Sequence, residues 1–174
     1  MNILVVSDSH GHDADVEAAI EKANAQFGKI DAMIHLGDVG ANYPGVSNMA
    51  HVPTYMACGN CDYPNETLRN ILVLHFGGHK IFAVHGHRQG VNMDLSTLRY
   101  NALENDCDIA LFGHTHVPFA EINENDVSFL NPGSVSLPRG GSKLRSYAVI
   151  QIDDFDDLSI SFGNLENDEI ESVE

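Results

Sequence analysis

Met1-Asn-Ile-Leu-Val-Val-Ser-Asp-Ser-His-Gly-His12 is the stretch that decides the fold. Its apolar part, Ile3 to Val6, is rich in β-branched residues and predicts a buried strand. Asp8 and His10 follow at once, where the strand ends and the chain turns. A similar order of apolar strand, glycine and metal-type side chain recurs four times downstream. We therefore expect the five strand ends to form one site.

The bulk composition indicates one globular domain. The chain has 174 residues with 43% hydrophobic content, which is enough for a core of its own. No apolar run approaches the roughly 20 residues that span a membrane, and no basic region precedes Ile3 as in a signal peptide. Three cysteines make a poor disulfide framework and suit a reducing compartment. We expect a cytoplasmic protein with no membrane partner.

The net charge is −16, from 25 acidic against 9 basic residues, and no basic stripe is present. Duplex nucleic acid is therefore not an expected partner, because its binding requires several Lys or Arg contacts to phosphate. A small anionic substrate stays open, because bound divalent ions would make one site locally positive. Whether the chain forms a homo-oligomer also stays open.

Strand and helix patterns alternate in the first half of the chain, and antiparallel strand patterns dominate the second half. This order favours two packed sheets flanked by helices over one doubly wound sheet. Residues 163–174 carry five acidic residues and no basic one, so we expect a fraying acidic tail after a single domain of residues 1–162. We expect strands at 3–6, 31–36, 53–57, 70–76, 79–84, 108–112, 118–122, 127–130, 146–152 and 157–162, helices at 16–27 and 94–104, and a loop with one helical turn at 40–51.

Side chains that commonly bind metals stand at the expected strand ends. They are two carboxylates, one amide and four imidazoles: Asp8, His10, Asp38, Asn60, His85, His114 and His116. Imidazole with carboxylate suits manganese, iron, zinc or nickel, and the absence of a thiolate cluster argues against a structural zinc. Seven ligands suit two ions, which need a shared carboxylate that only Asp8 or Asp38 can supply.

Five short blocks carry a resemblance to a known family. They are Asp8-Ser-His10, Gly37-Asp38, Gly59-Asn-Cys-Asp62, His85-Gly86 and Gly113-His-Thr-His116. Together and in this order they resemble the signature blocks of the calcineurin-like metallophosphoesterase superfamily. The small size, the Asn-Cys-Asp block and Asn131-Pro-Gly-Ser134 resemble the YfcE-type phosphodiesterases more closely.

The resemblance implies the metallo-dependent phosphatase fold, an α/β/β/α sandwich of two mixed sheets flanked by helices, with a dinuclear centre. One ion would be held by Asp8, His10, Asp38 and His116, and the other by Asp38, Asn60, His85 and His114, with Asp38 as the bridge. A hydroxide between the ions would attack the phosphorus of a small phosphodiester. Manganese is the expected metal, with nickel, iron, zinc or magnesium as alternatives. The residues implied to be catalytic are His114, Asn60, Cys61 and Asp62.

One position departs from the superfamily, where the block usually reads Gly-Asn-His-Asp and the histidine assists the leaving group. Cys61 stands there instead, and a thiol with a reference pKa of about 8.5 is a poorer proton donor. We therefore expect modest turnover of alkyl phosphodiesters and faster turnover of aryl ones. Cys58 and Cys61 also match C-x-x-C, but Tyr63-Pro64 follow instead of a helix, which disfavours a redox pair.

Two other functions stay open at this point. A phosphomonoesterase could use the same site, and a scaffold of the retromer-subunit type shares the resemblance but has lost key histidine ligands. The presence of all four histidine ligands here argues against the scaffold. His87 and Arg139 are candidate substrate contacts, with a surface role as the alternative. His35 is expected to lie in the core or to support the ligands from behind, and not to be a ligand itself.

Overall fold

The computed structural model describes residues 1–173 and contains two mixed sheets. The first sheet has seven strands: β1 (Asn2–Val6), β2 (Ala32–His35), β3 (Thr54–Ala57), β4 (Leu68–Arg69), β10 (Ser146–Ile152), β11 (Leu158–Asn164) and β12 (Glu171–Val173). Their order across the sheet is β12-β11-β10-β1-β2-β3-β4. The strands β1 to β4 pair in parallel, whereas β10, β11 and β12 pair antiparallel.

The second sheet has five strands and is also mixed. They are β5 (Leu72–Phe76), β6 (His79–Ala83), β7 (Ile109–Leu111), β8 (Pro118–Glu121) and β9 (Ser128–Pro132), in the order β5-β6-β7-β9-β8. The central strands β6, β7 and β9 are parallel, and the edge strands are antiparallel to them. The helices are α1 (Asp13–Phe27), α2 (Tyr43–Met49) and α3 (Ser96–Glu104), with a 3-10 turn η1 at His87–Gln89.

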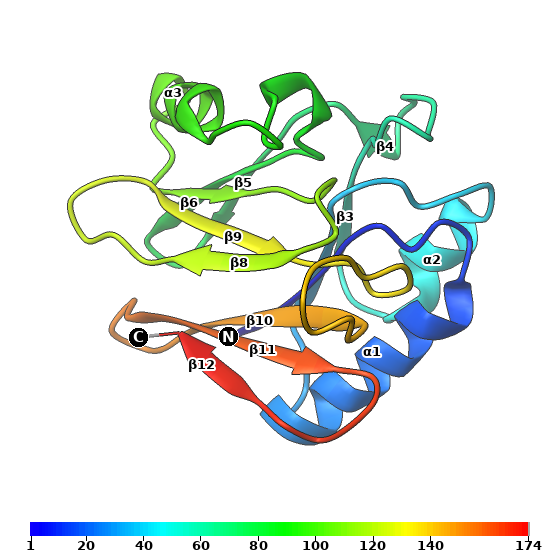
Figure 1. Ribbon diagram of the computed structural model, residues 1–174. Helices are drawn as coiled ribbons and strands as arrows, with labels where there is room; N and C mark the ends of the chain where they lie inside the picture. The colour runs from blue at the N-terminus through cyan, green and yellow to red at the C-terminus, as the bar shows by residue number, and fades with distance from the viewer. Residues whose placement is uncertain (174) are drawn as a thin grey trace.

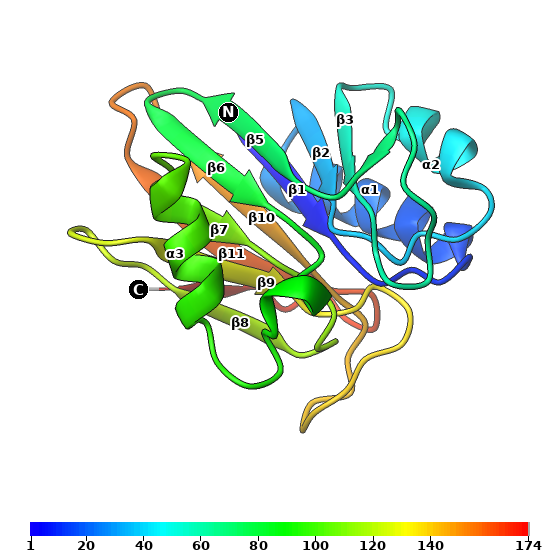
Figure 2. The same ribbon diagram turned by 90° about the horizontal axis from the view of Figure 1, so that it is seen from above.

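The alternation of side chains along β1 explains the layering. Ile3 and Val5 pack into the layer between the two sheets, while Leu4 and Val6 pack against the helix α1 on the other face. On the far side, α3 places Leu98 in a third apolar cluster on the outer face of the five-stranded sheet (Figure 2). Figure 1 shows the resulting order of helix, sheet, sheet and helix. The four-layer α/β/β/α prediction is confirmed.

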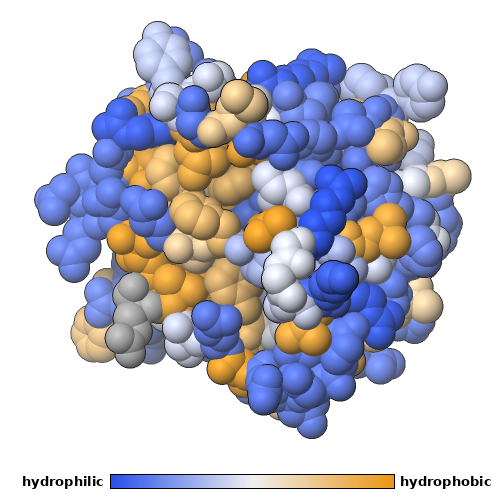
Figure 3. All heavy atoms as spheres, in the orientation of Figure 1, coloured by the Kyte–Doolittle hydropathy of each residue, from blue (hydrophilic) through white to orange (hydrophobic). Residues whose placement is uncertain are grey.

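The layer between the sheets reaches the surface along one side. Half-buried apolar side chains, among them Ile122, Leu158 and Phe162, pack at the margin of this layer. Figure 3 shows an apolar area on the face where the edge strands β8 and β12 lie. The loop that follows β1 lies on the opposite, right-hand side in Figure 1, so the strand ends with the predicted ligands are away from this area.

Within residues 1–173, none of the helices has the length and hydropathy needed to cross a bilayer.

The C-terminal segment differs from the expectation of a fraying tail. Gly163 and Asn164 complete β11, and β12 adds to the edge of the sheet by pairing with β11. Basic side chains from distant parts of the chain also hold the segment, because Lys22 binds Asp168 at 3.0 Å and Arg145 binds Glu166 at 2.7 Å. All charged residues of this segment are acidic, so its own sequence gives no sign of these basic partners. The loop after β2 likewise holds the seven-residue α2, longer than the single turn expected, and the short β4 was not expected.

Candidate metal centre

The predicted ligands follow neighbouring strand ends in both sheets. Because β1, β2 and β3 are parallel neighbours, the turns that carry Asp8, Asp38 and Asn60 emerge at the same edge. The backbone N–H of Asp8 donates to Gly37 O at 3.0 Å, which joins the first two turns. The N–H of His114, which follows β7, donates to Asp8 Oδ2 at 3.1 Å. These bonds bring the site edges of the two sheets together.

Strained backbone is concentrated at these turns. Nine non-glycine residues of the described chain have a positive φ, and five of them are predicted ligands: Asp8 (56°), His10 (47°), Asp38 (53°), His114 (68°) and His116 (60°). L-residues seldom adopt this left-handed conformation, and it persists where the surrounding structure enforces it, often at functional sites. The turns aim polar side chains inward although the local backbone would favour other conformations.

Both predicted carboxylates lie between two groups of imidazoles. Asp38 Oδ2 is 3.7 Å from His10 Nε2 and 3.5 Å from His85 Nε2. Asp8 Oδ1 is 3.1 Å from His116 Nε2 and 3.9 Å from the same His85 nitrogen. Both side chains are buried. Each carboxylate therefore lies within 4 Å of imidazole nitrogens on two sides.

The buried carboxyl of Asp8 favours its charged form. Burial alone would raise the pKa of Asp8, but the nearby His116 and His85 rings and the Ser7 hydroxyl outweigh it, so the pKa is lowered from 3.8. Ser7 Oγ donates to Asp8 Oδ2 at 2.6 Å. An ionised carboxylate is the form that binds a divalent ion.

Backbone carbonyls set the tautomers of two predicted ligands. His85 Nδ1 donates to Leu36 O at 2.8 Å, and His116 Nδ1 donates to Leu137 O at 2.6 Å, since a carbonyl oxygen can only accept. In the neutral ring, Nε2 then keeps its lone pair and faces the carboxylates. The Nε2 atoms of His10 and His116 are only 3.4 Å apart. This arrangement of imidazole nitrogens is typical of ligands that converge on a cation.

One buried carboxylate oxygen without a hydrogen bond indicates that the site fits metal ions. Asp8 Oδ1 is buried and accepts no hydrogen bond in the structure, although His116 Nε2 lies nearby. A buried carboxylate oxygen without a partner is costly, and a divalent cation would compensate it. Three sets of donor atoms each lie within 4.8 Å of one another: Asp8, His10 and His116; His10, Asp38 and Cys61; and Asp8, Asp38 and His85. The donors therefore fit divalent metal ions.

The other two predicted ligands complete the cluster. Asn60 Oδ1 is 3.1 Å from His85 Nε2. The ring of His114 lies 5.1 Å, centroid to centroid, from the His85 ring. The structure thus brings all seven predicted ligands together from the turns that follow five strands of the two sheets, β1, β2, β3, β6 and β7.

Asp62 has a positioning role in the structure. Its carboxylate accepts the backbone N–H groups of Val39 at 3.1 Å, Gly40 at 3.1 Å and Gly59 at 3.0 Å. Those amides flank the Asp38 turn and the start of the Asn60 turn. Asp62 therefore supports the backbone next to Asp38 and Asn60, and its catalytic role stays a prediction.

The two cysteines of the C-x-x-C sequence face different surroundings. Cys58 is buried in the core next to the helices α1 and α2, whereas Cys61 is exposed, and both are free thiols. The Cys61 N–H donates to Asp38 Oδ1 at 2.8 Å. Cys61 therefore belongs to the candidate site and Cys58 belongs to the core, which leaves no support for a redox pair.

The three remaining candidate residues occupy different places. The half-buried His87 ring lies 5.4 Å from the His85 ring and 6.1 Å from the His114 ring, at the margin of the site. Arg139 has an exposed side chain, and its backbone N–H donates to His116 O at 3.0 Å. His35 is fully buried, and burial lowers its pKa to about 4. The neutral His35 ring bonds Ser9 Oγ at 2.9 Å and so supports the turn from inside the core.

Sequence reasoning did not assign a role to three polar residues that support the ligands. Ser7 bonds the Asp8 carboxylate, and Ser134 Oγ donates to Asp8 O at 2.8 Å. Asn131 Nδ2 donates to Gly113 O at 3.0 Å and so holds the turn that leads to His114. The Asn131-Pro-Gly-Ser134 turn was a signal for two of them, because polar turn residues directly after a predicted strand can bond neighbouring backbone.

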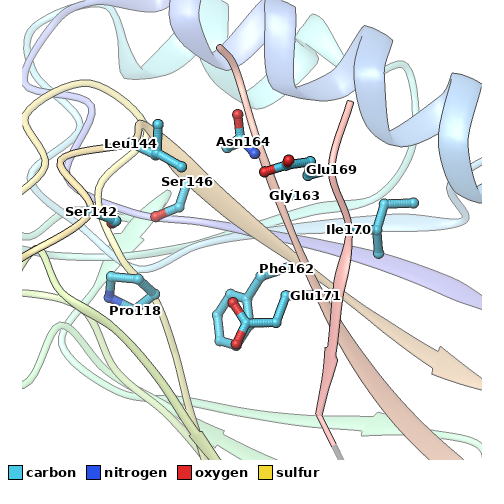
Figure 4. A pocket seen from close by; sticks show the side chains of 10 residues that line it. All are labelled: Pro118, Ser142, Leu144, Ser146, Phe162, Gly163, Asn164, Glu169, Ile170 and Glu171. Atoms are coloured by element: carbon cyan, nitrogen blue, oxygen red, sulfur yellow. The ribbon is translucent and has the colours of Figure 1, made fainter. Parts of the chain in front are cut away.

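A separate cavity of about 360 Å³ lies away from the candidate ligands (Figure 4). Its walls come from the start of β8, the loop before β10, the end of β11 and the segment that leads into β12. The lining includes Pro118, Leu144, Phe162, Asn164, Ile170 and Glu171 and none of the predicted ligands. The convergence of donor atoms, and not the size of a cavity, therefore identifies the candidate site.

Several relatives match the chain over most of its length, including proteins from Bacillus subtilis and Escherichia coli. The probable metallophosphoesterase YsnB of Bacillus subtilis is 32% identical over 176 residues, covering 100% of this chain and 97% of the relative. The phosphodiesterase YfcE of Escherichia coli is 28% identical over 182 residues, covering 88% of this chain and 89% of the relative.

Two of the solved structures that share the fold differ in their identity to this chain. A predicted phosphoesterase from Streptococcus pneumoniae matches with a TM-score of 0.79 at 33% identity, over 99% of this chain and 97% of that one. The zinc complex of Vps29 from Entamoeba histolytica matches with a TM-score of 0.77 at 22% identity, over 99% of this chain and 97% of that one, which shows the fold alone. The family model described as the calcineurin-like phosphoesterase superfamily domain matches residues 1–155. The chain therefore belongs to the calcineurin-like phosphoesterase superfamily and is a metallophosphoesterase.

Proposed function

We propose that the chain hydrolyses small phosphodiesters at a centre of two divalent ions. The observation that carries this proposal is the placement of Asp8 and Asp38 between two groups of imidazoles, with one buried Asp8 oxygen lacking a hydrogen bond. The similarity to a protein named as a phosphodiesterase supports the diester as substrate. Manganese is the metal we propose, because carboxylate and imidazole donors dominate the set.

Asp8, His10, Asp38, Asn60, His85, His114 and His116 would hold the divalent ions, which when bound would supply charge neutralisation of phosphate oxygens and a water molecule of lowered pKa. The chain's own residues prepare this chemistry. Leu36 O and Leu137 O hold His85 and His116 in the tautomer whose Nε2 is free. Ser7 donates to the Asp8 carboxylate, and Asp62 accepts the Gly59 N–H and so supports the backbone next to Asn60. Because these donors are ordered before substrate arrives, little reorganisation is needed in the transition state.

The leaving group would receive little help from the protein. Cys61 stands at the position where the larger superfamily has a histidine. Its side chain is exposed, and its backbone N–H donates to Asp38 Oδ1. Loss of general acid assistance typically costs about 10²–10⁴-fold in rate. We therefore propose faster turnover for diesters with aryl leaving groups, with His87 and Arg139 as the residues that contact the substrate.

The test is a matrix of metals against substrates. Manganese, magnesium, nickel, zinc and iron are each combined with an aryl phosphodiester, an aryl phosphomonoester and a cyclic nucleotide. We expect the highest kcat/KM for the aryl diester with manganese, and no activity in His114→Ala or Asp38→Asn. Faster turnover of the monoester would replace the diester proposal with a phosphomonoesterase on the same site.

A second candidate function is a scaffold, which the shared fold with Vps29 favours. Metal content separates the two functions. A purified chain that binds no manganese, and hydrolyses none of the substrates, would support the scaffold. Two ions per chain together with turnover would reject it.

A further inference from the structure

We propose that Cys61 is an additional metal ligand, whose Sγ joins His10 and Asp38 as donors to one of the two ions. The inference rests on the proposed dinuclear centre and adds to it a sulfur ligand that the family resemblance does not assign. It makes the two ion positions chemically different. The position with Cys61 would favour softer metals than the position beside His85 and Asn60.

The donor atoms are close enough to share an ion. His10, Asp38 and Cys61 each offer an atom within 4.8 Å of the other two, and His10 Nε2 lies 3.7 Å from Asp38 Oδ2. Bonds of about 2.0–2.3 Å to nitrogen, oxygen and sulfur place the donors of one ion about 3–4 Å apart. The separations among the three donor atoms are therefore within about 1–2 Å of those that a bound ion requires.

Hydrogen bonds fix Cys61 beside the site and leave its sulfur available. The Cys61 N–H donates to Asp38 Oδ1 at 2.8 Å, so the two residues keep their separation while Asp38 Oδ2 faces His10 and His85. Asn60 Nδ2 donates to Cys61 Sγ at 3.4 Å. A donated N–H of this kind stabilises a sulfur that carries negative charge.

The other two cysteines offer a matched comparison. Cys58 and Cys107 are buried in the apolar clusters of the helix-covered faces, and of the three cysteines, all within the described residues, only Cys61 is exposed. Its donor atom lies within 4.8 Å of those of His10 and Asp38. When the sulfur binds, its proton leaves to solvent and the thiolate contributes one negative charge to the centre.

The experiment uses the full chain loaded with cobalt(II), because a sulfur ligand gives cobalt a near-ultraviolet charge-transfer band that oxygen and nitrogen ligands do not give. We expect this band in the wild type and in the control Cys107→Ser, and its loss in Cys61→Ser. Competition with cadmium gives a second measurement. We expect the affinity for cadmium to fall about tenfold in Cys61→Ser, while that for magnesium changes little.

Three outcomes separate this inference from the proposed function. Cobalt binding at two ions per chain without the band, or a band that persists in Cys61→Ser, overturns the sulfur ligand and leaves the hydrolase intact. A band without hydrolysis of any phosphodiester supports the sulfur ligand and overturns the proposed activity. If Cys61→Ser does not fold, alkylation of Cys61 in the wild type decides, because bound metal must slow alkylation of Cys61 if its sulfur is a ligand.

Discussion

Substitution of Gly59 by alanine gives a sharp test of the site geometry. A Cβ at Gly59 would overlap the backbone nitrogen and Oδ1 of Asp38 and would lie 2.7 Å from its Cγ, where ordinary contacts are 3.4–4 Å. Gly59 is not among the residues with a positive φ, so alanine fits the local backbone and only this collision acts. Asp38 must move by roughly 1 Å, and a misplacement of that size costs about 10²-fold in rate.

The same collision lowers stability by about 1–3 kcal/mol, the usual cost of overpacking. For a domain of this size, we expect a Tm decrease of about 2–4 °C per kcal/mol. The assay is kcat/KM on an aryl phosphodiester with saturating manganese, together with thermal unfolding and metal content. The control is Gly141→Ala, because a Cβ there meets no atom within 4 Å. Gly59→Ala with wild-type kcat/KM and metal content would refute the placement of Asp38 against Gly59.

Three further predictions follow from single residues. Cys61→His should raise kcat/KM for alkyl phosphodiesters relative to aryl ones by about tenfold or more, because an imidazole can protonate the leaving group. An equal effect on both substrates would reject the idea that residue 61 assists the leaving group. Asp62→Ala should lower the free energy of unfolding by about 1–3 kcal/mol in urea titrations, because backbone amides at Val39, Gly40 and Gly59 lose their acceptor. An unchanged free energy of unfolding would show that these hydrogen bonds contribute little to stability. Burial lowers the pKa of His79, but Asp108 and the Asp156 carbonyl outweigh it, so the folded pKa is raised above 6.5. Its stabilising effect should therefore be complete below pH 6.5 and disappear as the pH rises through the raised pKa, so the wild type and His79→Gln should converge in stability at higher pH. The exposed His75→Gln is the control, and a difference that grows with pH would contradict the sign.

The sequence predicted most of the fold because the strands are short apolar runs that end in glycine and polar residues. Ile3 to Val6 is buried throughout, and its alternate side chains serve two different core layers, which is why the run has no polar position. The acidic tail was predicted wrongly to fray, because the residues that hold it, Lys22 and Arg145, are far away in the chain. Local composition contains no information about such distant partners.

The candidate ligands were predictable because each follows a strand directly, whereas the groups that orient them were not. The carbonyls of Leu36 and Leu137 set the tautomers of His85 and His116, and any residue type could supply a carbonyl. The role of Asp62 in binding three amides also depends on the path of the folded chain. Spacing predicts which side chains meet, but their orientation comes from tertiary hydrogen bonds.

Anomalous diffraction from crystals grown with manganese measures the central claim most directly. We predict two peaks about 3.5–4 Å apart, one beside His10 and His116 and the other beside His85 and His114, with a carboxylate oxygen of Asp38 or Asp8 between them. A single peak, or manganese bound away from these side chains, would contradict the dinuclear centre and the hydrolysis proposed for it.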